Sequence, residues 1–142
     1  MNKELVVEMQ VQVEAKPMEV WNALTDPESI KKYFFGTEAK SDWKVGSSLV
    51  FRNEGGGKTY EDKGTILKSD PGKCLEYSYW SAYSGLKDVP ENYSTVSYQL
   101  TENASGTTID LKQQGFASED SHAHAETGWG MVFKGLKDLL EN

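Results

Sequence analysis

The stretch GWGMVFKGLKDLL, residues 128–140, decides the fold of this chain. Its large apolar residues recur every three or four positions, as they do on one side of an amphipathic helix. They are Trp129, Val132, Phe133, Leu136, Leu139 and Leu140. The pattern predicts a long C-terminal helix, beginning near Ser121, whose apolar stripe needs a broad apolar surface to cover it.

Strand patterns supply that surface. Residues 5–13 alternate, with Val7, Met9 and Val11 on one face, and this is the period of a strand buried on one side. Six further strands, separated by turn signals, are expected at 37–43, 47–53, 59–68, 73–81, 93–101 and 107–114. The helical stripe must therefore lie on the concave face of the sheet, because no other predicted element is long enough to cover it.

Two short helices are predicted between the first two strands. Pro17 suits the first turn of a helix, where its missing N–H costs little. Asp26-Pro27 ends that helix, because the residue before proline avoids helical angles. Pro27, capped by Asp26, starts a second helix that reaches about Tyr33 or Phe34. A strand, two helices, a run of antiparallel strands and a long helix make an α+β fold with about seven strands.

The composition limits the class of protein. A length of 142 residues fits one domain spanning residues 1–142. The formal net charge of −7 argues against binding to nucleic acid or to anionic membranes, since both would repel the chain. Cys74 is the only cysteine, so no internal disulfide can form and a reducing compartment is favoured. With a polar start and no long apolar run, the protein is expected in the cytoplasm.

Short motifs along nearly the whole chain match a known pattern. In chain order they are Pro17, Val20-Trp21, Ala23-Leu24-Thr25-Asp26-Pro27, Gly64, Asp70-Pro71, Ser94-Thr95-Val96, Gly106-Thr107-Thr108, Gly128-Trp129 and Leu136-Lys137-Asp138-Leu139. They resemble the family of activator of heat-shock-protein-90 ATPase homologues (AHSA-like). This family belongs to the START-like, birch-pollen-allergen-like (SRPBCC) superfamily.

The resemblance implies a helix-grip fold, in which a curved antiparallel sheet wraps around the C-terminal helix and leaves an apolar cavity between them. Known members of the superfamily bind lipids, hormones and flavonoid-like molecules, and a few are cyclases. The family name implies a heat-shock ATPase as a partner and a role in the stress response.

Aromatic residues are the main candidates for a binding site. They come from helices and strands that should converge, and they are Trp21, Phe34, Phe51, Tyr77, Tyr79, Tyr98, Trp129 and Phe133. One interpretation is a plain packed core, and the other is the wall of a cavity for a small apolar or aromatic molecule, which the resemblance favours. Gly128, Gly130 and Gly135 in the last helix point to a close approach by the sheet or a ligand.

Other candidate sites are weaker. His122 and His124 are two residues apart and cannot face one metal ion from one helix, so a solvated helix start is expected. The Gly55-Gly56-Gly57-Lys58-Thr59 run lacks the spacing of a phosphate-binding loop and indicates a hairpin turn. Cys74 has no base near it in sequence and is expected to be inert. We therefore expect no metal, no cofactor and no catalytic residue.

Three functions remain open from the sequence. The first is a small-molecule-binding module, and the second is an accessory protein for a heat-shock ATPase. The third is a cyclase-like enzyme, which needs convergent acid–base groups inside and is disfavoured because the predicted inward face is almost wholly apolar or tyrosine. The second short helix and the polar loop at 81–92 are expected to form a mobile entrance to the cavity.

Overall fold

Seven antiparallel strands form one curved sheet in the computed structural model, which describes residues 1–55 and 57–141. The strands are β1 (Asn2–Val13), β2 (Glu38–Lys40), β3 (Ser48–Gly55), β4 (Lys58–Asp70), β5 (Cys74–Tyr79), β6 (Ser94–Asn103) and β7 (Gly106–Phe116). The helices are α1 (Pro17–Thr25), α2 (Pro27–Tyr33) and α3 (Glu119–Glu141), with a short 3-10 turn at Pro90–Asn92. Gly56, in the hairpin turn predicted at 54–58, lies outside the described residues.

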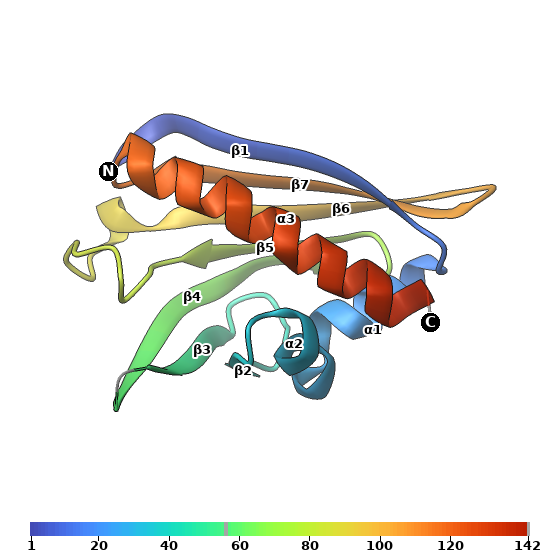
Figure 1. Ribbon diagram of the computed structural model, residues 1–142, viewed down its shortest axis with the longest axis horizontal. Helices are drawn as coiled ribbons and strands as arrows, with labels where there is room; N and C mark the ends of the chain where they lie inside the picture. Colours follow the sequence, from blue (N-terminus) through green and yellow to red (C-terminus); the bar gives the residue numbers. More distant parts are fainter. Residues whose placement is uncertain (56, 142) are drawn as a thin grey trace.

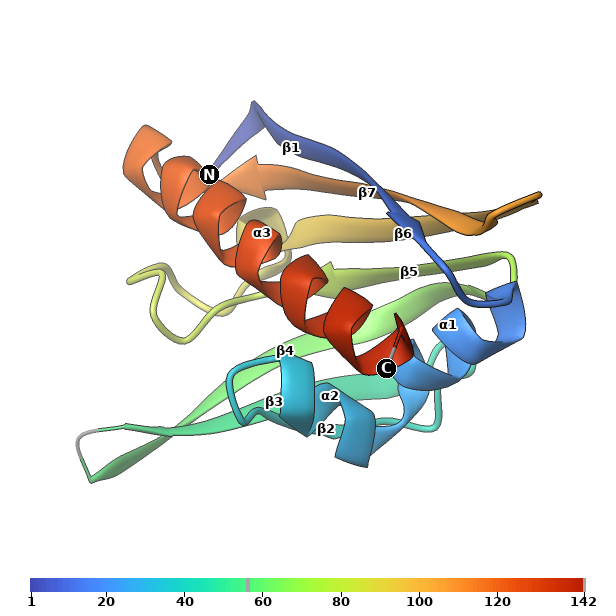
Figure 2. The same cartoon turned by 45° about the vertical axis from the view of Figure 1, so that its right-hand side comes forward.

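The sheet and the long helix form two layers (Figures 1 and 2). The strand order is β1-β7-β6-β5-β4-β3-β2, so β2 to β7 pair in chain order and β1 joins β7 at the edge. Helix α3 runs diagonally across the concave face, and α1 and α2 lie near its C-terminal half. This arrangement confirms the predicted α+β helix-grip fold with two short helices after the first strand.

Two predicted strands are shorter than expected. The strand at 37–43 is only the three-residue β2, because the chain turns at Trp43, whose φ of 59° is left-handed. The strand at 73–81 ends at Tyr79, and Trp80 forms only an isolated bridge to β4. Trp43 and Trp80 have side chains that favour strands, but the chain leaves the strand near each of them.

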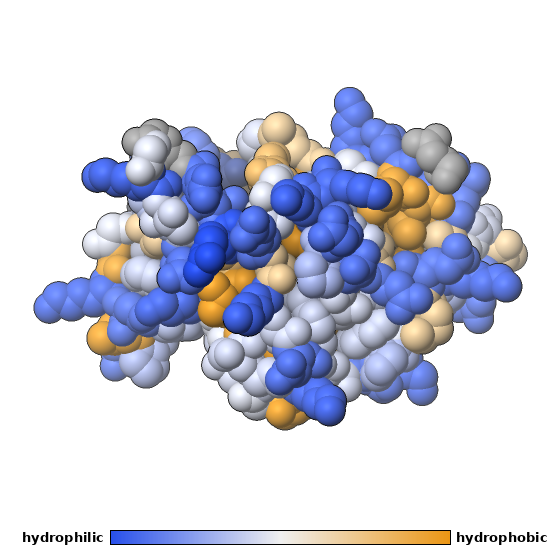
Figure 3. All heavy atoms as spheres, turned by 90° about the horizontal axis from the view of Figure 1, so that it is seen from below, coloured by the Kyte–Doolittle hydropathy of each residue, from blue (hydrophilic) through white to orange (hydrophobic). Residues whose placement is uncertain are grey.

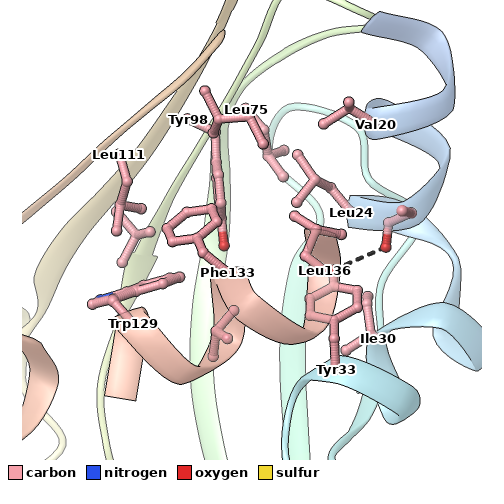
Figure 4. Close-up of a cluster of buried hydrophobic side chains, with 14 of the residues drawn as sticks. Val20, Leu24, Ile30, Tyr33, Leu75, Tyr98, Leu111, Trp129, Phe133 and Leu136 are labelled. Carbon is pink, nitrogen blue, oxygen red and sulfur yellow. Dashed lines mark hydrogen bonds between the residues drawn. The ribbon is translucent and has the colours of Figure 1, made fainter. Parts of the chain in front are cut away.

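The apolar stripe of α3 packs against the sheet as predicted. Trp129 and Phe133 both meet Tyr98 edge-on, with ring centroids 5.9 and 6.5 Å apart. Figure 4 shows these side chains and Leu136 pointing from the helix toward the strands. The helix begins at Glu119, slightly before the expected start, and no helix in the described part of the chain is long and apolar enough to cross a membrane.

Tyr33 joins α2 to this core. Its hydroxyl donates a hydrogen bond to the carbonyl oxygen of Ala23 in α1, 2.9 Å away (dashed line in Figure 4). Gly135 allows α3 to approach Tyr33, since a Cβ at position 135 would lie 3.1 Å from the Tyr33 Cβ. A Cβ at Gly128 or Gly130 would meet nothing within 4 Å, so the expected close approach holds only for Gly135 and is made by α2.

Burial changes the titration of three core tyrosines. It raises the pKa of Tyr33, Tyr77 and Tyr98, because a phenolate would lose its hydration inside the protein. A hydrogen bond with Tyr98 opposes part of the rise in the pKa of Tyr77. The folded protein therefore keeps these phenols protonated at pH values where the unfolded chain would ionise them.

Gly64 is required where the backbone of β5 lies close against β4. A Cβ at this position would lie 1.8 Å from the carbonyl oxygen of Ser78, which is far inside van der Waals contact. The atom it would meet belongs to the backbone, so no side-chain rotation can relieve the clash. Glycine is thus the residue that lets the two strands stay paired here.

Replacing Gly64 with alanine should destabilise the protein by about 3 kcal/mol, the upper range for overpacking, because β4 and β5 must separate. Denaturant unfolding measures this change in the free energy of unfolding. Gly130→Ala is the matched control and should stabilise by about 1 kcal/mol, since it removes a helical glycine in open space. Equal stability of the Gly64→Ala variant and the wild type would contradict the close approach of the Ser78 backbone to Gly64.

Stability should fall as the pH rises above about 10, the ordinary pKa of tyrosine. The unfolded state then releases phenolic protons that the folded state retains, so each fully buried tyrosine lowers the free energy of unfolding by about 1.4 kcal/mol per pH unit. Chemical unfolding between about pH 9 and 11 checks the slope. Tyr98→Phe should reduce the slope, and an unchanged slope would show that Tyr98 ionises freely in the folded protein.

Candidate functional site

A cavity of about 710 Å³ lies beside the N-terminal half of α3. Its floor comes from the inward side chains of β5, β6 and β7, and one wall comes from α3 between Asp120 and Val132. The opposite wall comes from β3, β4 and the segment that joins α2 to β2. The cavity therefore lies between sheet and helix, toward the end remote from α1.

Four of the eight aromatic candidates line this cavity: Phe34, Tyr77, Tyr79 and Trp129. Phe34 stacks on Phe51, with ring centroids 5.7 Å apart and planes 8° from parallel. It also meets Trp129 edge-on at 6.1 Å. These contacts hold flat apolar surfaces on two sides of the space.

The other four candidates belong to the packed core. Phe51 and Tyr98 border a second space of only about 10 Å³, about the volume that one water needs. Trp21 and Phe133 are buried and line neither space. The core is therefore filled toward α1 and open toward the start of α3.

An acidic side chain also faces the cavity, a polar group that the sequence analysis did not identify. Asp62 on β4 is 5% exposed. Its Oδ2 accepts a hydrogen bond from the Tyr79 hydroxyl at 2.6 Å, and its Oδ1 accepts one from the Ala82 amide at 2.8 Å. Burial, followed by the Asp62 charge, raises the pKa of Tyr79 well above its usual value.

A chain of hydrogen bonds forms the floor between helix and sheet. Trp129 Nε1 donates to Gln113 Oε1 at 2.8 Å, and Gln113 Nε2 donates to Ser94 Oγ at 3.2 Å. The Ser94 hydroxyl in turn donates to the carbonyl oxygen of Tyr79, also at 3.2 Å. The buried polar groups thus satisfy one another and fix the Trp129 indole in one orientation.

The sequence contained a signal for these polar residues. Alternation along β4 places Asp62 and Gly64 on the face of the buried Ile66. The same alternation places Gln113 with Leu111 on β7. On each strand, a polar residue of the cavity lies on the same face as a buried apolar residue. Asp62 is four residues before Ile66, and Gln113 is two residues after Leu111.

Two exposed aromatic residues flank the opening. Phe35, after α2, is 59% exposed and has a left-handed φ of 56°. Tyr83, in the loop predicted at 81–92, is 61% exposed and stacks on Tyr60 with ring centroids 4.3 Å apart. Both line the cavity, so the loop at 81–92 and the residues just after α2 border it, whereas no residue of α2 itself does. The mobility of those segments stays a prediction.

His122 is not in the solvated helix start that the sequence indicated. Its Nε2 lies 2.7 Å from the carbonyl oxygen of Val6, its Nδ1 lies 3.3 Å from Glu126, and its ring packs edge-on against Phe116. These contacts tie α3 to the edge strand β1. His124 is exposed and lines the cavity.

Within residues 1–55 and 57–141, no three side chains of the metal-binding types gather into a cluster. Cys74 is half-buried at the start of β5.

Three comparisons relate the chain to known proteins. A family model described as activator of Hsp90 ATPase homolog 1-like protein matches residues 14–141. The solution structure of ChR145 from Cytophaga hutchinsonii is 42% identical over 100% of this chain and 97% of that chain, with a TM-score of 0.85. A comparison with curated proteins found no match.

Two further solved structures share the fold at lower identity. The Aha1 dimer from Colwellia psychrerythraea is 22% identical over 96% of each chain, with a TM-score of 0.75. DynU16, from the dynemicin biosynthetic locus, is 22% identical over 97% of this chain but only 48% of its own, with a TM-score of 0.80. Because the family model matches residues 14–141 of the 142, the chain belongs to the activator of Hsp90 ATPase homolog 1-like family.

Proposed function

We propose that the protein binds a small, largely apolar or aromatic molecule in the cavity between the sheet and the N-terminal half of α3. The observation that carries this proposal is an open space of about 710 Å³ in an otherwise filled core. That volume falls within the range of ligand pockets, about 300–1,000 Å³. Aromatic walls with a few fixed polar groups are also typical of such pockets.

The polar groups of the cavity hold its walls in place. Each carboxylate oxygen of Asp62 accepts one hydrogen bond from the protein, and Gln113 is held between Trp129 and Ser94. This network suits a binding site, because walls that are already fixed lower the entropy that the protein loses when a ligand binds.

The family name favours a second function, an accessory role beside a heat-shock ATPase. Such a partner would need an outer surface of the protein. Figure 3 shows one face, on which hydrophilic side chains cover most of the surface and apolar ones form separate small patches. A partner on this face would be recognised through polar contacts, and calorimetric titration with a purified ATPase of this class would detect it.

Gly128 offers a way to fill the cavity without disturbing the fold. It lines the cavity, and a Cβ there would meet nothing within 4 Å. Gly128→Leu should therefore place an apolar side chain in the space that a ligand needs. Binding of a neutral probe such as naphthylmethanol, followed by two-dimensional amide NMR, should weaken at least about tenfold, since one lost apolar side-chain space is worth roughly 1.4 kcal/mol.

Gly130→Leu is the matched control. Gly130 is exposed, has the same open space around its Cβ position and does not line the cavity. Both variants should gain up to about 1 kcal/mol of stability, because each removes a helical glycine. Only the Gly128 variant should lose binding. Equal binding by both variants would place the probe elsewhere, and no binding by the wild type would favour the ATPase role.

A further inference from the structure

Asp62 is a buried acid that the apolar-ligand proposal does not use. Its two hydrogen-bond donors, the Tyr79 hydroxyl and the Ala82 amide, are both neutral. Asp62 is in none of the ion pairs Arg52–Glu61, Lys63–Asp88, His122–Glu126 and Lys137–Glu141. Asp62 therefore brings a negative charge to the cavity without a cation of the protein beside it.

A carboxylate in this position has room for another donor. Each carboxylate oxygen has about two acceptor sites, and each oxygen of Asp62 accepts one hydrogen bond from the protein. A buried charge is costly unless it is paired, so a cation that entered the cavity would gain more here than in water. The aromatic wall adds to this gain, because ring faces attract cations.

The exposed charged groups around the cavity are of both signs. Glu54 and Asp120 line it, and so do Met1, with its positively charged amino terminus, and His124. No lysine or arginine is among the described residues that line it. These groups are exposed and therefore screened by water and salt, whereas Asp62 is buried. A ligand carboxylate beside Asp62 would be repelled, and an ammonium group there would be attracted.

We propose that the ligand is an aromatic or apolar molecule that carries a protonated amine, with the ammonium beside Asp62 and the apolar body against Phe34 and Trp129. This inference rests on the proposed binding function and names its ligand class. It follows from the position of one buried carboxylate on β4, in the same cavity as the flat aromatic surfaces of Phe34 and Trp129.

Three probes with one ring system test the charge. Naphthylmethylammonium, naphthylmethanol and naphthoate are titrated into the intact protein in about 0.15 M salt, where the Debye length of about 8 Å screens the exposed rim. The ammonium should bind at least about tenfold more tightly than the alcohol, as expected for a charge-assisted hydrogen bond, and naphthoate should bind most weakly. The amide of Ala82 should shift most with the ammonium probe, because it donates to the same carboxylate.

Two variants distinguish the effect of the Asp62 charge from the effect of the other acidic residues of the protein. Asp62→Asn keeps the shape and removes the charge, so it should abolish the preference for the ammonium over the alcohol. Glu54→Gln removes one charge from the rim and should change that preference less than about twofold, because an exposed charge at the rim is screened by water and salt. Loss of the preference in Glu54→Gln alone would overturn the assignment to Asp62.

The outcomes also separate this inference from the proposed function. If no probe binds the wild type, the binding function fails and the inference fails with it. If the ammonium and the alcohol bind equally, or if Asp62→Asn keeps the preference, the binding function stands and the amine class is wrong. If Asp62→Asn does not fold, Tyr79→Phe replaces it: it frees Oδ2, so the preference should persist or grow, and its loss would overturn the inference.

Discussion

One constraint shapes the molecule: a single helix must cover the concave face of a seven-stranded sheet. Helix α3 has large apolar residues only from Trp129 onward, whereas its first half carries small or polar residues such as Ser121, Ala125 and Gly128. The core is therefore filled where the stripe exists, around Phe133 and Leu136, and hollow where it does not. The cavity follows from the point in the sequence at which the stripe begins.

Trp129 lies where the filled part of the core meets the cavity, and it contacts both. Its ring packs against Tyr98 and Phe133 in the filled part, and it also lines the open part. Its indole N–H is held by Gln113, whose amide is bonded to Ser94. A tryptophan beside an empty space would otherwise be free to turn into it, so these hydrogen bonds keep the cavity from collapsing.

The fold could be predicted from the sequence because it depends on periodic patterns, such as the stripe of α3 and the alternation of β1. Boundaries were less predictable at Trp43 and Trp80, where turns interrupt residues that favour strands. The division of the aromatic residues between core and cavity could not be predicted, since it depends on which part of α3 each strand residue faces in the folded protein. Asp62 was predictable in principle, because it shares its strand face with Ile66, but its contacts with Tyr79 and Ala82 required the folded loop.

Two residues on opposite walls of the cavity work against stability. Gly128 costs α3 about 1 kcal/mol relative to alanine, although a Cβ there would meet nothing. Asp62 is a buried carboxylate without a cation of the protein beside it, and burying an unpaired charge is costly. Gly130 is also a helical glycine in open space, so a glycine alone does not indicate a site. The combination is different, because one residue keeps the space empty and the other makes it acidic. Proteins often give up stability at functional sites, which is the physical basis for our proposals that the cavity binds a ligand and that this ligand carries a positive charge.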